Sequence, residues 1–147
     1  MAMNSISLAV AIASVLASVA AAWIAKSSLS QAKQVADRDQ RDWKQRKWAD
    51  MYLKADETYD ALDRFHILSD SWDTDERERE WSHLIRLIRG AHAMAVVFPH
   101  NPAVEAFLSS TAVFKDEKTV SDDRLSKVFD AVELIRQKAL LPATVLE

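Results

Sequence analysis

The sequence predicts an all-α protein with an N-terminal single transmembrane helix that continues into a helical stalk and a small antiparallel helical bundle. Three observations lead to this prediction. The first 25 residues carry no charged side chain, the 147-residue chain holds one glycine and three prolines, and apolar residues elsewhere recur at spacings of three and four. Sheets with tight turns depend on glycine, whereas three-and-four spacing is typical of amphipathic helices.

Residues 1–25 are the predicted transmembrane anchor. Residues 6–25 read ISLAVAIASVLASVAAAWIA, and about 20 predominantly apolar residues suffice for a helix to cross the hydrocarbon core of a bilayer. A cleaved signal peptide is one alternative, although the positive charge that normally opens such a peptide is missing here. A buried helix of a soluble protein is another, but it would need a larger core than a chain of this length builds.

The charges that flank this segment predict its orientation. No basic residue precedes it, and residues 26–47 hold seven basic and three acidic side chains. Basic residues beside a span are retained on the cytoplasmic side. We therefore expect a single-pass protein of the cell membrane, with its N-terminus outside and its C-terminal domain in the cytoplasm. Residues 26–47 are the predicted basic polar helical stalk.

Small residues recur along one side of the predicted span. An alanine stands at every fourth position, at Ala9, Ala13, Ala17, Ala21 and Ala25. Such a row lets two helix backbones approach closely in lipid, which favours oligomers. The abundance of alanine in this segment is the alternative explanation of the row.

Residues 48–147 are predicted to form a cytoplasmic four-helix domain. Its first helix has an apolar face made of Trp48, Met51, Tyr52, Ala55, Tyr59, Leu62, Phe65 and Leu68. After a polar turn, Asp73 or Thr74 is expected to cap a second helix that runs to about Phe98. Gly90 within that helix indicates either a close helix crossing or no special role.

Two further helices complete the predicted domain. Asn101 is expected to cap a short helix with Pro102 in its first position, whose apolar residues are Val104, Phe107, Leu108 and Val113. A charged loop over residues 115–119 follows, and Ser121 is expected to cap the last helix. Pro142 is expected to end this last helix. The apolar residues of the helix are Leu125, Val128, Phe129, Val132, Ile135 and Leu140.

The candidate chemistry is confined to two carboxylate-x-x-histidine triplets, Asp63 to His66 and Glu80 to His83. Dimetal helical bundles use such triplets on two helices and a further glutamate on each of the others, and Glu105 and Glu133 could complete the set. The core spacing of the second helix leaves Glu80 and His83 on its flank, which favours an ordinary solvated face. We therefore predict no catalytic, cofactor-binding or metal-binding residues.

The amino-acid composition excludes several classes of function. The chain has no cysteine and too few glycines for nucleotide-binding loops. Residues 48–147 hold twelve basic and nineteen acidic side chains, which argues against binding to nucleic acid. We expect a non-enzymatic, membrane-anchored interaction or scaffolding module without a cofactor, whose partners are the lipid bilayer and another protein or its own copies. Two alternatives stay open: a carboxylate and histidine dimetal-binding bundle, and an oligomerising membrane-acting effector.

Overall fold

The computed structural model describes the backbone of residues 2–141 and the side chains of residues 10–141. Within these ranges the protein is all-helical and contains no strand, which confirms the predicted class. The chain divides into two compact units, one ending at Arg41 and one beginning at Asp42.

The longest element, α1, extends from Ala2 to Leu68 without interruption. Neither proline nor glycine occurs in this stretch, so every backbone N–H after the first turn can bond four residues back. The first unit consists of the N-terminal part of α1 alone. The sequence correctly predicted one long apolar N-terminal helix.

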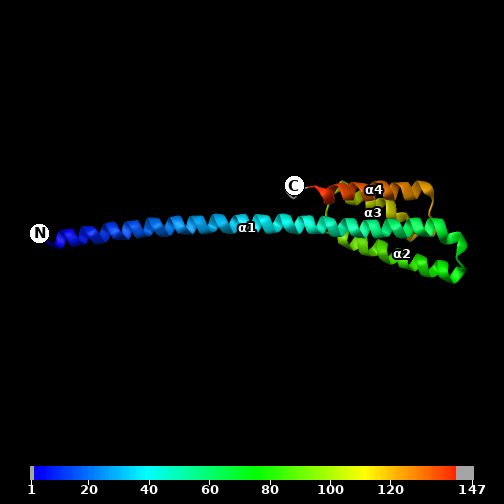
Figure 1. Ribbon diagram of the computed structural model, residues 1–147, viewed down its shortest axis with the longest axis horizontal. Coiled ribbons are helices and arrows are strands. Elements are labelled where there is room, and N and C mark those ends of the chain that lie inside the picture. The colour runs from blue at the N-terminus through cyan, green and yellow to red at the C-terminus, as the bar shows by residue number, and fades with distance from the viewer. Residues whose placement is uncertain (1, 142–147) are drawn as a thin grey trace. The chain divides into compact units, whose positions relative to one another are not determined.

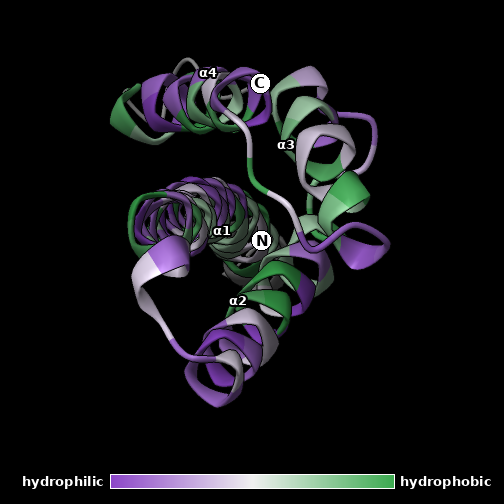
Figure 2. Cartoon of the chain, turned by 90° about the vertical axis from the view of Figure 1, so that its right-hand side faces the viewer, coloured by the Kyte–Doolittle hydropathy of each residue, from purple (hydrophilic) through white to green (hydrophobic). Residues whose placement is uncertain are grey.

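The second unit contains the rest of α1 and three further α-helices (Figure 1). Its other elements are the 3-10 helix η1 (Ser69–Ser71), α2 (Thr74–Ala95), α3 (Pro102–Ala112), the 3-10 helix η2 (Val113–Lys115) and α4 (Asp122–Leu140). In the end-on view of Figure 2, α2 and α4 lie on different sides of α1, and α3 lies across from α1 between them.

All four helices supply apolar side chains to one hydrophobic core. Its largest fully buried members are Met51, Leu62, Leu84, Ile88, Val104, Phe107, Phe114, Val128 and Ile135. Aromatic rings pack where α1 and α2 are joined: Phe65 lies 5.6 Å from Trp72 and 5.0 Å from Trp81, between ring centroids. Edge-to-face pairs of this kind stabilise beyond the area that they bury.

The helix starts follow the predicted capping residues. Asp73 accepts a 2.7 Å hydrogen bond from the backbone N–H of Glu76 at the start of α2. Asn101 accepts hydrogen bonds from the N–H groups of Ala103 and Val104, and Pro102 occupies the first turn of α3. Each cap satisfies donors that have no partner within the helix.

The structure corrects two predictions at helix ends. α2 ends at Ala95 rather than near Phe98, because the chain turns at residues 96–100 and His100 adopts a positive φ of 59°. Ser121 does precede α4, but its side chain makes no capping hydrogen bond. The predicted end of the last helix at Pro142 lies outside the described residues.

The structure also corrects part of the predicted core. Leu68, Val113, Phe129 and Leu140 are exposed, whereas Phe114 is fully buried in place of Val113. Helical spacing explains the exchange, since Phe114 stands seven residues after Phe107 and three after Thr111, on the buried face of this segment, whereas Val113 lies off that face. Gly90 does not mark a close crossing within the chain, because a Cβ atom added there would meet no atom within 4 Å.

Candidate functional site

One helix of the described residues is long and apolar enough to cross a membrane, and its apolar stretch lies near the N-terminus. From Val10 to Ala25 every residue is exposed in the protein, including Leu16 at 64%. No charged residue interrupts this stretch. The hydroxyl of Ser18 donates to the backbone oxygen of Ser14 at 2.9 Å, so this polar group is satisfied within the helix. Polar groups in the hydrocarbon core of a bilayer must be hydrogen-bonded within the protein, because no water is present there.

The alanine row follows the same exposed stretch. Ala13, Ala17, Ala21 and Ala25 are all exposed, so their surface is open to a neighbouring helix. Ala9 lies outside the residues whose side chains the structure describes. Trp23, at the C-terminal end of the stretch, is 71% exposed.

The first histidine triplet is used in packing between helices. The Nδ1 atom of His66 lies 2.9 Å from the backbone oxygen of Val120, and its Nε2 atom lies 2.8 Å from Oδ1 of Asp122. This contact joins the end of α1 to the start of α4, across 54 residues of sequence. Asp63 takes no part in these bonds, so the triplet does not act as one ligand pair.

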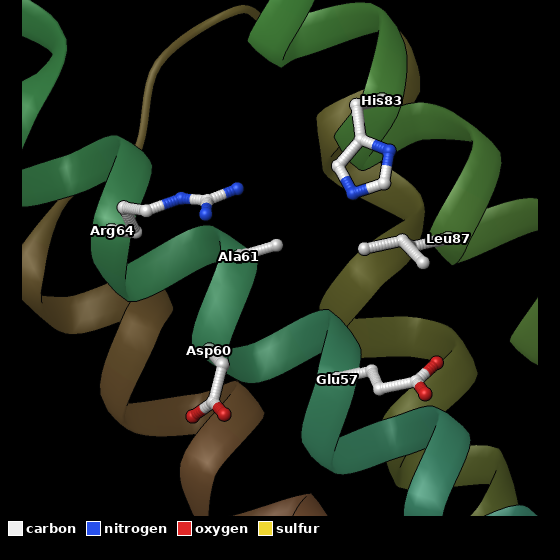
Figure 3. A pocket seen from close by; sticks show the side chains of 6 residues that line it. All are labelled: Glu57, Asp60, Ala61, Arg64, His83 and Leu87. Atoms are coloured by element: carbon white, nitrogen blue, oxygen red, sulfur yellow. The ribbon is translucent and has the colours of Figure 1, made fainter.

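The second triplet lies on the other side of α1, at a groove of about 500 Å³ between α1 and α2 (Figure 3). Arg64 and Ala61 of α1 point toward His83 and Leu87 of α2, while Asp60 points away from His83. Glu80 pairs with Arg64, with 3.0 Å between their nearest charged atoms. The groove is also lined by Glu57, which pairs with Lys54 at 2.7 Å.

The structure therefore does not bring the two triplets together. His66 faces α4, whereas His83 faces the groove beside Ala61. The remaining candidates are occupied elsewhere: Glu133 pairs with Arg136, and Glu105 lies near His100. Among the described residues, no three histidine, aspartate or glutamate side chains are grouped so that they could hold a metal ion.

A polar contact that the sequence did not reveal joins α2 to α3. His92 Nε2 lies 2.7 Å from the hydroxyl of Thr111, which donates to the backbone oxygen of Phe107 at 2.8 Å. The hydroxyl must therefore accept from His92, and Nδ1 is left to accept from Lys115 at 3.4 Å. Burial lowers the pKa of His92 from its ordinary value of 6.5, and Lys115 lowers that pKa further. The imidazole is thus held neutral as a structural link.

Comparison with known proteins gives no independent indication of function. No protein-family model, curated protein or solved structure matches this chain. The exposed apolar stretch of α1 and the surface of the helical unit are therefore the features that indicate function.

Proposed function

We propose that this chain is a single-pass membrane protein, with its N-terminus outside the cell and a four-helix cytoplasmic domain that binds another protein or further copies of itself. It acts as a tether rather than as an enzyme. Residues 1–25 anchor it, residues 26–47 form a basic stalk beside the membrane, and residues 48–147 present the interacting surface.

One observation carries the proposal, namely the exposure of an uncharged apolar helix segment on all of its faces. Large apolar side chains that remain exposed around a whole helix would be unfavourable in water. Val10, Ile12, Val15, Leu16, Val19, Trp23 and Ile24 are all of this kind. A bilayer removes every one of these side chains from water without a protein partner.

The charges beside the segment support the proposed orientation. The seven basic residues of the stalk begin at Lys26, immediately after the apolar stretch. Retention of such residues in the cytoplasm would place the helical domain there. Attraction of the stalk to anionic lipid headgroups would add to the anchoring.

Extraction of membranes at alkaline pH tests the anchor. We expect the full chain to stay in the membrane pellet after carbonate treatment. Replacing Leu16 by arginine at the centre of the segment costs about 2.5–3.5 kcal/mol of insertion free energy, so L16R should shift markedly to the supernatant. The matched control is L53R, since Leu53 is also exposed but lies in the helical domain, and this variant should stay in the pellet. A wild-type chain found in the soluble fraction would refute the proposal.

A further inference from the structure

The outward face of α1 in the helical domain carries three aspartates, which we call the aspartate face: Asp56, Asp60 and Asp63. Their spacing of four and three residues places them on one side of the helix. None of the three forms an ion pair within the part of the chain that the structure describes. Tyr59 lies among them and packs on Phe129 of α4, with 5.4 Å between ring centroids. Phe129 is 48% exposed, so apolar surface borders the acidic groups.

These groups are electrostatically unfavourable to one another. Burial raises the pKa of Asp56, and the charge of Asp60 raises it further. The pKa of Tyr59 is likewise raised by burial, by Asp63 and by Asp60. A positive charge brought to this face would relieve that repulsion.

Three arginines on the outward side of α2 form what we call the arginine face: Arg79, Arg86 and Arg89, with the exposed Asp75 one turn before Arg79. All three side chains are exposed, and none forms an ion pair with a carboxylate among the described residues. Gly90 and Ala93 are also exposed on this side of α2, and the space beside Gly90 is open. Small residues let another helix approach this face closely.

The two faces lie at matching heights in the domain. The ion pair between Arg64 and Glu80 fixes the register of α1 against the returning α2. By this register, and at about 1.5 Å per residue, Arg79 lies within a turn of the level of Asp63. Arg89 lies close to the level of Asp56 in the same way. A second copy placed alongside and turned about the direction of the helices, without a shift along them, would therefore bring arginines opposite aspartates (Figure 2).

We propose that the arginine face of one copy docks on the aspartate face of the next copy, so that the protein associates side by side through its helical domains. This inference rests on the proposed function, because anchoring in one membrane gives all copies the same orientation. The two surfaces differ, so the contact is heterologous and builds rings or rows rather than closed two-fold dimers. Because the charges are exposed, the association weakens as salt increases.

Single cysteines in the full chain can detect this contact, since the natural sequence contains none. Ala93 borders the arginine face, and Ala49 is an exposed residue on the aspartate side of α1 near the same level. A93C and A49C chains with different tags are expressed together, and disulfide formation is induced in isolated membranes. The mixed product should exceed either like product by about tenfold, whereas unspecific collision of two chains gives about twofold.

Charge reversals distinguish a specific contact from misfolding. R86E in the A93C chain, or D60R in the A49C chain, should each remove most of the mixed product. Combining the two reversed chains should restore it, because the charges are again opposite. K138E is the matched control, since Lys138 is exposed near the end of α4 and forms no ion pair in the described residues, and it should leave the mixed product unchanged.

Two results would overturn the inference: mixed and like products in the random ratio, or no recovery when R86E and D60R chains are combined. Fractionation of the same samples keeps the proposed function separate. If the chain is in the membrane but the mixed product is absent, only the association is wrong. If the chain is soluble, the proposed anchoring fails whatever the cross-link shows.

Discussion

Replacing Gly90 by alanine is expected to stabilise the helical domain by about 1 kcal/mol, the difference in helix propensity between these residues. Three structural facts set this magnitude. Gly90 lies in the interior of α2, has no positive φ and leaves open space where a Cβ atom would stand. The added methyl group therefore meets no clash, and the unfolded chain loses some of its conformational freedom as well.

For a unit of about 100 residues, 1 kcal/mol raises the midpoint of thermal unfolding by about 4 °C. The assay is near-ultraviolet circular dichroism of the full chain at low concentration in detergent, because the buried or partly buried Trp48, Trp72 and Trp81 report on domain packing. A93G, at an exposed position of the same helix, should lower the midpoint by up to about 4 °C. An unchanged or lower midpoint for G90A would mean that the space beside Gly90 is filled in the folded domain, contrary to the structure.

Three more predictions concern the polar contacts of the domain. The pKa of His92 is lowered in the folded domain, so the unfolded chain takes up a proton near pH 6.5 while the folded domain does not, and stability should fall as pH drops below about 6.5. In H92Q the side chain can still donate one hydrogen bond and accept another but does not titrate, so its midpoint of thermal unfolding should fall less between pH 7.5 and 5.5. H66A should cost about 1 kcal/mol in the same assay, because it removes the imidazole that contacts the Val120 carbonyl and the Asp122 carboxylate and donates a hydrogen bond to one of these acceptors. D122N should cost less than about 0.5 kcal/mol, since Asp122 is 96% exposed. Equal losses for the two variants would contradict this difference. N101A should cost about 1 kcal/mol through loss of the α3 cap, and a neutral result in denaturant unfolding would show that the cap is not needed.

Local signals in the sequence were enough to predict most helix positions. Asp73 and Asn101 act within three residues of themselves, so their capping roles could be read directly from short segments. The scarcity of glycine and proline predicted the all-helical class for the same local reason.

Contacts that depend on tertiary packing could not be predicted from the sequence alone. The contact of His66 with Val120 joins residues 54 positions apart, and no periodic pattern indicates it. The link from His92 to Thr111 likewise required the packing of α2 on α3. Phe129 has core spacing on α4 yet remains half exposed, because its ring lies over Tyr59 at the edge of the domain. The aspartate and arginine faces could not be recognised in the sequence either, since a solvated charged surface and a charged interface have the same amino-acid composition.

Labelling of single cysteines with a membrane-impermeant maleimide distinguishes a chain that spans the membrane through residues 1–25 from a chain that does not. N4C and S109C chains are compared in intact cells and in permeabilised cells; Ser109 is exposed on α3. If residues 1–25 span the membrane with the N-terminus outside, N4C is labelled in intact cells and S109C is labelled only after permeabilisation. Labelling of S109C in intact cells, or protection of both positions, would contradict this topology.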